Sequence, residues 1–125
     1  MSAPDAFKFS ETHEWVKLDG EIATIGISDH AQAELGDVAL TLLPEVGRML
    51  QRGDKLGEIE SIKAVSDLFA PMSGEVIAVN DTLVDAPEQI NDDPYGKGWM
   101  VRVKITHPEE ADLLLDGAAY ESSQN

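Results

Sequence analysis

The chain has 125 residues, of which 42% are hydrophobic, and its formal net charge is −15 at pH 7. This size is typical of one domain with one hydrophobic core, so we expect a single domain over residues 1–125. The charge excludes nucleic acids and anionic membranes as partners, because both bind basic surfaces. The absence of cysteine excludes disulfides, thiol nucleophiles and thiolate metal sites. The acidic surface either serves solubility alone or steers the protein towards partners with basic docking surfaces.

The sequence carries no targeting signal that we can identify. The N-terminal segment Met1–Asp5 is neither apolar nor rich in arginine, and so resembles neither a signal peptide nor a transit peptide. No apolar run approaches the length of about 20 residues that a membrane-spanning helix needs. We therefore expect a cytoplasmic, bacterial protein, although a processed organellar chain would look the same.

The first half of the chain predicts, in order, strands over residues 13–18 and 21–27, a short helix over 29–35 and a buried strand over 38–43. Asp19-Gly20 between the first two strands is a dipeptide typical of tight hairpins. Asp29 and Gln32 have the spacing of a capping box, and Gly36 follows as the stop signal of the helix.

The second half predicts strands over residues 55–60, 65–70, 75–79 and 99–105, and a helix near 108–116. Alternating apolar and polar residues support the strands. Residues 81–98 are rich in proline, asparagine, aspartate and glycine, and we expect a long surface loop there. Pro108 near the start of the last helix and Gly117 at its end agree with the usual helix boundaries. The pattern predicts a mostly β fold.

Lys63 lies between two predicted strands, at the tip of a hairpin that would present its amine to solvent. Most surface lysines have no special role, but the surroundings of this one show a faint internal repeat with a period of 27 residues. Gly47 and Gly53 recur as Gly74 and Asn80, residue types that tolerate a left-handed backbone. Two similar β units beside the lysine predict a small sandwich with approximate two-fold symmetry and the lysine at one apex.

The unmodified chain lacks the motifs of an enzyme. Its three histidines, His13, His30 and His107, share no spacing, and no zinc-protease, phosphate-loop or nucleophile-elbow pattern is present. The acidic pairs Asp92-Asp93 and Glu109-Glu110 are typical of a solvated surface, so we expect no metal site. A carrier whose attached cofactor supplies the chemistry fits these observations better.

The segment Glu60-Ser61-Ile62-Lys63-Ala64-Val65-Ser66-Asp67-Leu68-Phe69-Ala70-Pro71-Met72-Ser73-Gly74-Glu75-Val76 resembles the lipoyl-attachment segment of the glycine cleavage system H protein. The resemblance covers about residues 7–120 and includes, in order, segments 13–16, 26–32, 35–38, 43–47, Asn91, 94–96 and 98–100. Residues 39–42 and Gln89 depart from the family pattern. The resemblance implies a lipoyl-domain-like flattened barrel or sandwich of two antiparallel sheets with quasi-two-fold symmetry.

The resemblance also implies a function. Lipoic acid would be joined by an amide bond to Lys63, within an attachment motif formed by Glu60, Ser61 and Ala64, through a lipoate ligase or lipoyl transferase. The lipoyl arm would accept an aminomethyl group from the pyridoxal-phosphate-dependent glycine decarboxylase. It would pass this group to the tetrahydrofolate-dependent aminomethyltransferase, and the FAD enzyme dihydrolipoamide dehydrogenase would reoxidise it. Such a shuttling carrier is expected to be a monomer.

In the family, the arm that carries the aminomethyl group (the loaded arm) is sheltered in a surface cleft. By position, Thr12, Glu14 and Asp67 match the groups that hold its ammonium. Carboxylates suit this role because charge-assisted hydrogen bonds are the strong kind. From the sequence alone, the pattern favours Glu14 and Asp67 as ordinary exposed acids, and only the family resemblance favours the cleft role.

Four other functions compete with this one. A biotin carrier places its lysine typically between methionines, whereas Ile62 and Ala64 flank Lys63. A lipoyl domain of a 2-oxoacid dehydrogenase complex shares the glycine spacing but is usually tethered to a longer chain. A lipoyl donor in lipoate assembly would use the same lysine for other clients. A plain acidic binding module would leave Lys63 unmodified.

Overall fold

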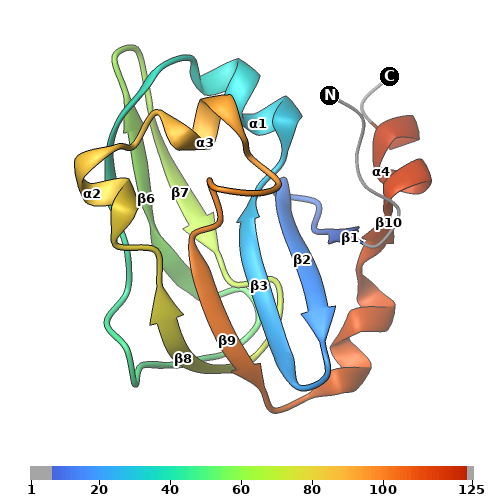
Figure 1. The fold of residues 1–125 in the computed structure, drawn as a ribbon. Helices are drawn as coiled ribbons and strands as arrows, with labels where there is room; N and C mark the ends of the chain where they lie inside the picture. The colour runs from blue at the N-terminus through green and yellow to red at the C-terminus, as the bar shows by residue number, and fades with distance from the viewer. Residues whose placement is uncertain (1–6, 124–125) are drawn as a thin grey trace.

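A computed structural model describes residues 7–123 and contains two antiparallel sheets (Figure 1). The larger sheet has seven strands in the order β10 (Leu115–Asp116), β1 (Phe7–Phe9), β2 (Glu14–Asp19), β3 (Ile22–Ile27), β9 (Val101–Ile105), β8 (Gly74–Val79) and β5 (Met49–Leu50). The smaller sheet has three strands in the order β4 (Val38–Leu42), β6 (Lys55–Ser61) and β7 (Val65–Phe69). The predicted mostly β sandwich is confirmed, and among the described strands neither sheet closes into a barrel.

The helices are short; those within residues 29–92 lie together at one end of the sheets, and those within residues 108–123 lie beside the larger sheet (Figure 1). They are α1 (Asp29–Leu35), α2 (Thr82–Asp85), α3 (Gln89–Asp92), the 3-10 helix η1 (Pro108–Leu113) and α4 (Gly117–Ser123). In the part of the chain that the structure describes, no helix is long and apolar enough to cross a membrane.

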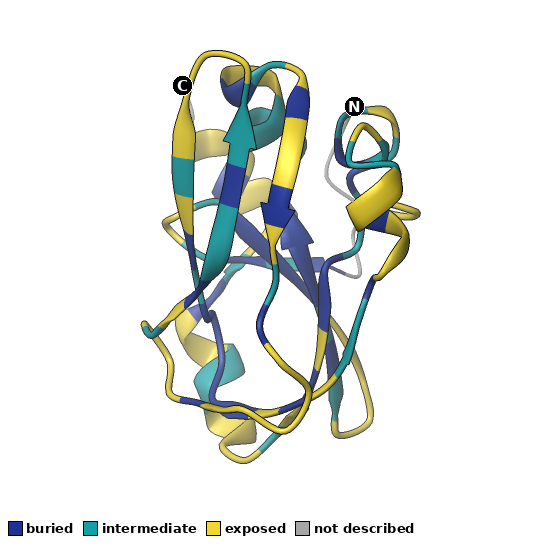
Figure 2. Ribbon diagram, turned by 90° about the vertical axis from the view of Figure 1, so that its left-hand side faces the viewer, coloured by how far each residue is buried: buried dark blue, intermediate teal, exposed yellow. Residues whose placement is uncertain are grey.

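The core lies between the two sheets, because alternate residues of each strand face inwards. Figure 2 shows this division, with buried segments on the inner strands and exposed segments on the edges and turns. Residues from both sheets form one buried cluster that includes Ile25, Ile59, Leu68, Val76 and Val103. A second cluster joins the larger sheet to α4 and consists of Phe7, Phe9, Trp15 and Tyr120. Strand β1 and helix α4, at the two ends of the described range, therefore share one cluster.

The start of α1 differs slightly from the prediction. Ser28 is the N-cap, and its Oγ accepts a hydrogen bond from Ala31 N at 3.1 Å. Asp29 instead accepts a side-chain bond from Gln32 Nε2 at 2.9 Å. The predicted stop is confirmed, because Gly36 has a φ of 78° and its N–H donates to Gln32 O at 3.0 Å. Only glycine adopts this backbone conformation without strain.

The predicted surface loop at 81–98 contains the two short helices α2 and α3. Each places one apolar residue in the core, Leu83 and Ile90, both with no exposed surface. The sequence did not predict these helices for two reasons. The segment is rich in turn-forming residue types, and a four-residue helix with one inward position shows no hydrophobic periodicity. The loop is thus a lid over one end of the core.

The C-terminal region is more divided than expected. The predicted helix at 108–116 is a 3-10 helix over Pro108–Leu113 followed by the short strand β10. Gly117 begins α4 and does not end the preceding helix. Prediction placed Pro108 correctly at the helix start but missed that the chain turns back to pair with β1.

The backbone repeat of 27 residues is present only in part. Gly47 and Gly53 have φ values of 98° and 92°, as the first copy predicted. Gly74 and Asn80 are not among the residues with positive φ. Gly74 lies in β8 for another reason, because an added Cβ would approach Lys104 O to 2.3 Å. The second copy therefore lacks the predicted left-handed turn.

Candidate functional site

Lys63 lies in the turn that joins β6 and β7, at one end of the molecule (Figure 1). Ser61 closes this turn: its N–H donates to Ala64 O at 2.8 Å. Ser61 Oγ accepts hydrogen bonds from Lys63 N at 3.2 Å and from Ala64 N at 3.0 Å. Glu60, the first residue of the attachment motif, pairs across the hairpin with Val65. The backbone around the lysine is therefore ordered by its own sequence.

A second contact fixes the tip of the hairpin to the chain that follows α1. Ile62 N donates to Asp37 O at 3.3 Å. The Lys63 side chain rests along Gly36, since its Cε is 3.2 Å from the place of a Cβ on that glycine. Within residues 7–123, no carboxylate lies within 4.0 Å of the Lys63 amine. The lysine is exposed, as predicted, and its amine faces no carboxylate counter-ion in the described part of the chain.

A cleft of about 230 Å³ opens beside the hairpin and brings the three predicted cleft residues together. Its lining includes Ala64 from the attachment motif and Thr12, Glu14 and Asp67. The walls come from the turn before β2, from α1 and from β7. Sequence reasoning missed the other lining residues, which are His13, Ile27, Ala31, Glu34, Leu35, Ile59, Val65, Ser66 and Leu68. The cleft thus has a mainly apolar floor and a polar end.

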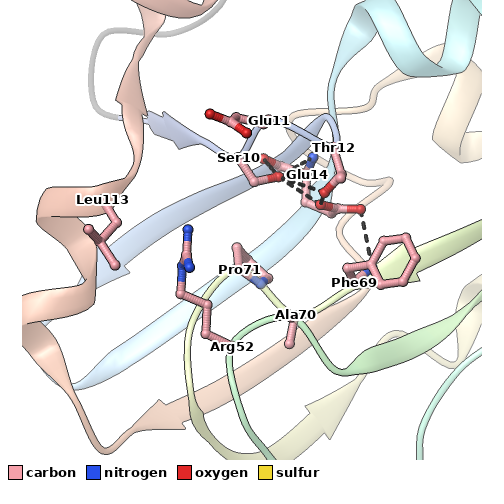
Figure 3. A pocket seen from close by; sticks show the side chains of 10 residues that line it. Ser10, Glu11, Thr12, Glu14, Arg52, Phe69, Ala70, Pro71 and Leu113 are labelled. Carbon is pink, nitrogen blue, oxygen red and sulfur yellow. Dashed lines mark hydrogen bonds between the residues drawn. The ribbon is translucent and has the colours of Figure 1, made fainter.

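Glu14 is the most unusual group of the cleft, because a carboxyl side chain with 1% exposure lies at the polar end. Its Oε1 accepts hydrogen bonds from Ser10 Oγ at 2.7 Å and from the Thr12 hydroxyl. Its Oε2 accepts a bond from Phe69 N at 3.2 Å (Figure 3). Burial raises the pKa of Glu14 above its ordinary value, and these hydrogen bonds oppose the rise.

Glu14 and Thr12 separate the cleft from a second cavity of about 330 Å³, which Ser10, Arg52 and Phe69 also line (Figure 3). Prediction missed Ser10, although Ser10, Thr12 and Glu14 stand at alternate positions. This spacing was the available signal. The carboxyl group therefore belongs to a wall that is only one side chain thick.

Asp67 differs from Glu14 in its surroundings. It is exposed on β7, and its Oδ1 lies 3.4 Å from Lys55 Nζ. Lys55 also forms an ion pair with Glu58, the residue opposite Asp67 on the neighbouring strand. Exposed ion pairs of this kind contribute little to stability. Asp67 is therefore an accessible acid at the edge of the cleft.

One histidine lines the cleft, and a second histidine lies beside it. His13 lines the cleft, and its ring centroid is 5.0 Å from that of His30. Burial lowers the pKa of His13, and the neighbouring His30 lowers it further, while Glu34 has the opposite effect. His30 Nε2 lies 3.1 Å from Glu34 Oε1, one turn along α1. This part of the cleft carries both acidic and basic side chains.

Comparison with known proteins identifies the family. The family model described as glycine cleavage H-protein matches residues 7–125. The glycine cleavage system H protein of Rubrobacter xylanophilus is 54% identical over 111 residues, which are 89% of this chain and 86% of that protein. The mitochondrial glycine cleavage system H protein of Oryza sativa subsp. indica is 53% identical over 116 residues, 93% of this chain and 71% of that protein.

The fold agrees with this relationship. The crystal structure of a glycine cleavage system H protein from Mycobacterium marinum matches with a TM-score of 0.87 and 35% identity, covering 98% of each chain. Sequence and fold similarity both extend over nearly the whole chain. The protein therefore belongs to the glycine cleavage H-protein family.

Proposed function

We propose that this protein is the lipoyl carrier of the glycine cleavage system, with lipoic acid joined by an amide bond to Lys63. One observation carries the assignment to this residue: an exposed lysine, with no carboxylate counter-ion among residues 7–123, stands on an ordered hairpin directly beside a cleft. The names of the relatives support glycine cleavage and do not favour a 2-oxoacid dehydrogenase domain or a dedicated lipoyl donor.

The residues present fit such a group. Ser61 orders the backbone around Lys63, so that a ligase meets a defined loop with a free amine. The cleft begins at Ala64 and Val65, the two residues that follow the lysine. When bound, the lipoyl group supplies a disulfide that is reduced as it takes up the aminomethyl group of glycine. The protein itself contributes attachment and shelter and is a carrier component, not an enzyme.

The cleft divides into two parts with different tasks. Ile27, Leu35 and Leu68 form an apolar floor that excludes water from an aliphatic chain. At the polar end, Glu14 and Asp67 supply negative charge for an ammonium group, and Thr12 adds a hydroxyl acceptor. A carboxylate has about four acceptor positions, and the three donors around Glu14 leave one for a ligand.

The proposed partners are the remaining components of the cycle. They are the pyridoxal-phosphate-dependent glycine decarboxylase, the tetrahydrofolate-dependent aminomethyltransferase, FAD-containing dihydrolipoamide dehydrogenase, and the lipoate ligase or lipoyl transferase that installs the arm. The net charge of −15 supports fast, weak docking on basic surfaces of these enzymes. We place this function in the bacterial cytoplasm.

The attachment is tested by incubating the purified protein with a lipoate-protein ligase, ATP and lipoate and measuring its intact mass. The expected result is a gain of one lipoyl group, which Lys63→Arg abolishes. Lys55→Arg is the matched control, because Lys55 is another exposed lysine of the same hairpin and should leave the gain intact. A folded protein that gains nothing, or a gain that persists in Lys63→Arg, would contradict the proposal.

The cleft needs a separate test with the lipoylated protein. The double variant Glu14→Ala with Asp67→Ala removes both acids of the polar end, so the loaded arm should decompose faster in water. The measurement is the rate at which ammonia appears after the partner enzymes have been removed. An unchanged rate would dismiss the cleft as the site that shelters the arm.

A further inference from the structure

Tyr120 reaches from α4 to two chain segments that contribute walls to the cleft. Its side chain is buried, with 2% exposure, and its ring stacks on Phe9 at a centroid distance of 4.4 Å and an angle of 11°. The hydroxyl lies 2.7 Å from His13 Nδ1 and 2.6 Å from Ser28 Oγ. These partners are 107 and 92 residues away in the sequence. One hydroxyl thus joins two distant segments.

The first segment is the turn that supplies Thr12 and Glu14 to the cleft. His13 stands between them with a φ of 76°, the one described non-glycine residue in the left-handed region. Such a conformation persists only where the surroundings hold it. His13 N donates to Ser10 O at 3.2 Å, and His13 O accepts from Ser28 N at 2.9 Å. The Tyr120 hydroxyl holds the side chain of this same strained residue.

The second segment is the start of α1, which forms the opposite wall of the cleft. Ser28 is fully buried and caps the helix through its bond from Ala31 N. Ala31 and Leu35 then line the cleft from α1. Because Ser28 Oγ contacts both Tyr120 and the helix, the orientation of α1 and that of the turn are fixed by one hydrogen-bonded group.

We propose that Tyr120 is a positioning residue, whose hydroxyl holds the turn at Thr12–Glu14 against the start of α1 and so sets the shape of the cleft. The inference rests on the proposed function of this cleft in sheltering the loaded arm. Tyr120 is absent from the cleft lining and acts through His13 and Ser28. Helix α4, at the end of the described chain, becomes part of the machinery that retains the arm.

The informative variant is Tyr120→Phe, because phenylalanine keeps the ring on Phe9 and removes only the hydroxyl. Tyr95→Phe is the matched control. Tyr95 belongs to the same aromatic cluster, and its hydroxyl accepts a bond from Asp29 N at 3.0 Å, also at the start of α1. Among residues 7–123, that hydroxyl forms no hydrogen bond with the Ser10–Glu14 turn. The control therefore removes a hydroxyl that holds one wall only.

Two measurements separate positioning from general stability. In the unlipoylated protein, Tyr120→Phe should shift the NMR signals of the His13 imidazole nitrogens and of the Thr12 and Glu14 amides, and Tyr95→Phe should leave them in place. In the lipoylated protein, Tyr120→Phe should shorten the lifetime of the loaded arm by about two- to twelve-fold, the range for losing the hydrogen bond to His13 alone. Equal unfolding temperatures of the two variants would exclude a stability effect.

A third variant tests the coupling. His13→Asn keeps a residue type that tolerates positive φ and removes the imidazole. If Tyr120 acts through His13, adding Tyr120→Phe to His13→Asn should shorten the lifetime no further. Full additivity, or unchanged NMR signals in Tyr120→Phe, would overturn the inference. If Tyr120→Phe fails to fold, His13→Asn alone removes the same hydrogen bond and should shorten the lifetime of the loaded arm.

Glu14→Gln in the same assay separates the sheltering role of the cleft from the positioning role of Tyr120. If Glu14→Gln shortens the lifetime and Tyr120→Phe does not, the cleft shelters the arm and only the positioning role is wrong. If neither variant changes the lifetime, the arm is sheltered elsewhere and both proposals fail together.

Discussion

Glu14 permits a sharp test of how burial and hydrogen bonding balance in the wall of the cleft, because it is a buried acid held by three hydrogen-bond donors. Two variants separate its charge from its contacts. Glu14→Gln keeps the volume and removes the charge, and the two hydroxyl groups beside it can turn to accept from the new amide. Glu14→Ala removes charge and contacts together. Comparing the two neutral variants with each other cancels the effect of burying a charge.

The magnitudes follow from the contacts. Replacing glutamine by alanine leaves Phe69 N without its partner, which costs about 1–3 kcal/mol for a buried donor. The loss of one buried methylene group, Cγ, adds about 0.8 kcal/mol. Ser10 and Thr12 are not fully buried and can bind water instead. We therefore expect Glu14→Ala to be about 2–4 kcal/mol less stable than Glu14→Gln, a difference of roughly 10 °C in unfolding temperature.

The sign of the charge effect depends on pH. Burial raises the pKa of Glu14, so the folded protein binds more protons than the unfolded chain above the ordinary value of 4.5. Its contribution to stability is therefore lost as the pH rises from 4.5 through the raised pKa. Relative to the wild type, Glu14→Gln should gain stability over this interval and keep that gain at neutral pH.

The assay is urea unfolding, followed by tryptophan fluorescence at several pH values between 4 and 8. All other titrating groups are shared, so they cancel in the difference between wild type and Glu14→Gln. If Glu14→Gln is instead less stable than the wild type at neutral pH, the hydrogen bonds outweigh burial and the pKa argument is wrong. If the expected sign is found, the protein retains a destabilising carboxylate, as is common for groups kept for function.

Three further predictions concern residues that support the site. Gly26→Ala would place a Cβ 2.6 Å from the buried Trp15 ring and should lower the free energy of unfolding in urea by about 2–3 kcal/mol. An unchanged midpoint would show that the Trp15 ring moves aside without cost. Ser61→Ala removes the three hydrogen bonds of Ser61 Oγ with Lys63 and Ala64 and should lower kcat/KM of lipoylation about five-fold; an equal rate would mean that the loop needs no order. Asn91→Ala breaks three hydrogen bonds that join α1, β4 and α3 and should cost about 2–3 kcal/mol; a smaller loss would indicate that water replaces the amide.

Local features explain what the sequence could predict. The β6–β7 hairpin, the helix stop at Gly36 and the exposed Lys63 each depend on residues within a few positions of one another. The three cleft residues Thr12, Glu14 and Asp67 required the family resemblance, because nothing local brings β7 to the turn before β2. Their shared cleft shows that the resemblance selected residues that are close in space.

The parts that prediction missed depend on distant contacts. Leu83 and Ile90 are buried in a segment whose composition is that of a loop, because each fills one gap at the end of the core. Tyr120 follows two alanines in a polar tail, and its partners lie 92 and 107 residues earlier. Single-chain patterns carry no information at this separation.

Loading and retention of the arm depend on different anchors in this fold. Ser61 and Asp37 order the hairpin that carries Lys63, whereas Tyr120 joins the cleft walls from the opposite side. In the described residues these two sets of contacts share no side chain. Ser61→Ala should therefore slow lipoylation and leave the lifetime of the loaded arm unchanged, while Tyr120→Phe should do the reverse. Under the proposed function, separate anchors would let the lysine face several enzymes in turn while the cleft keeps one shape.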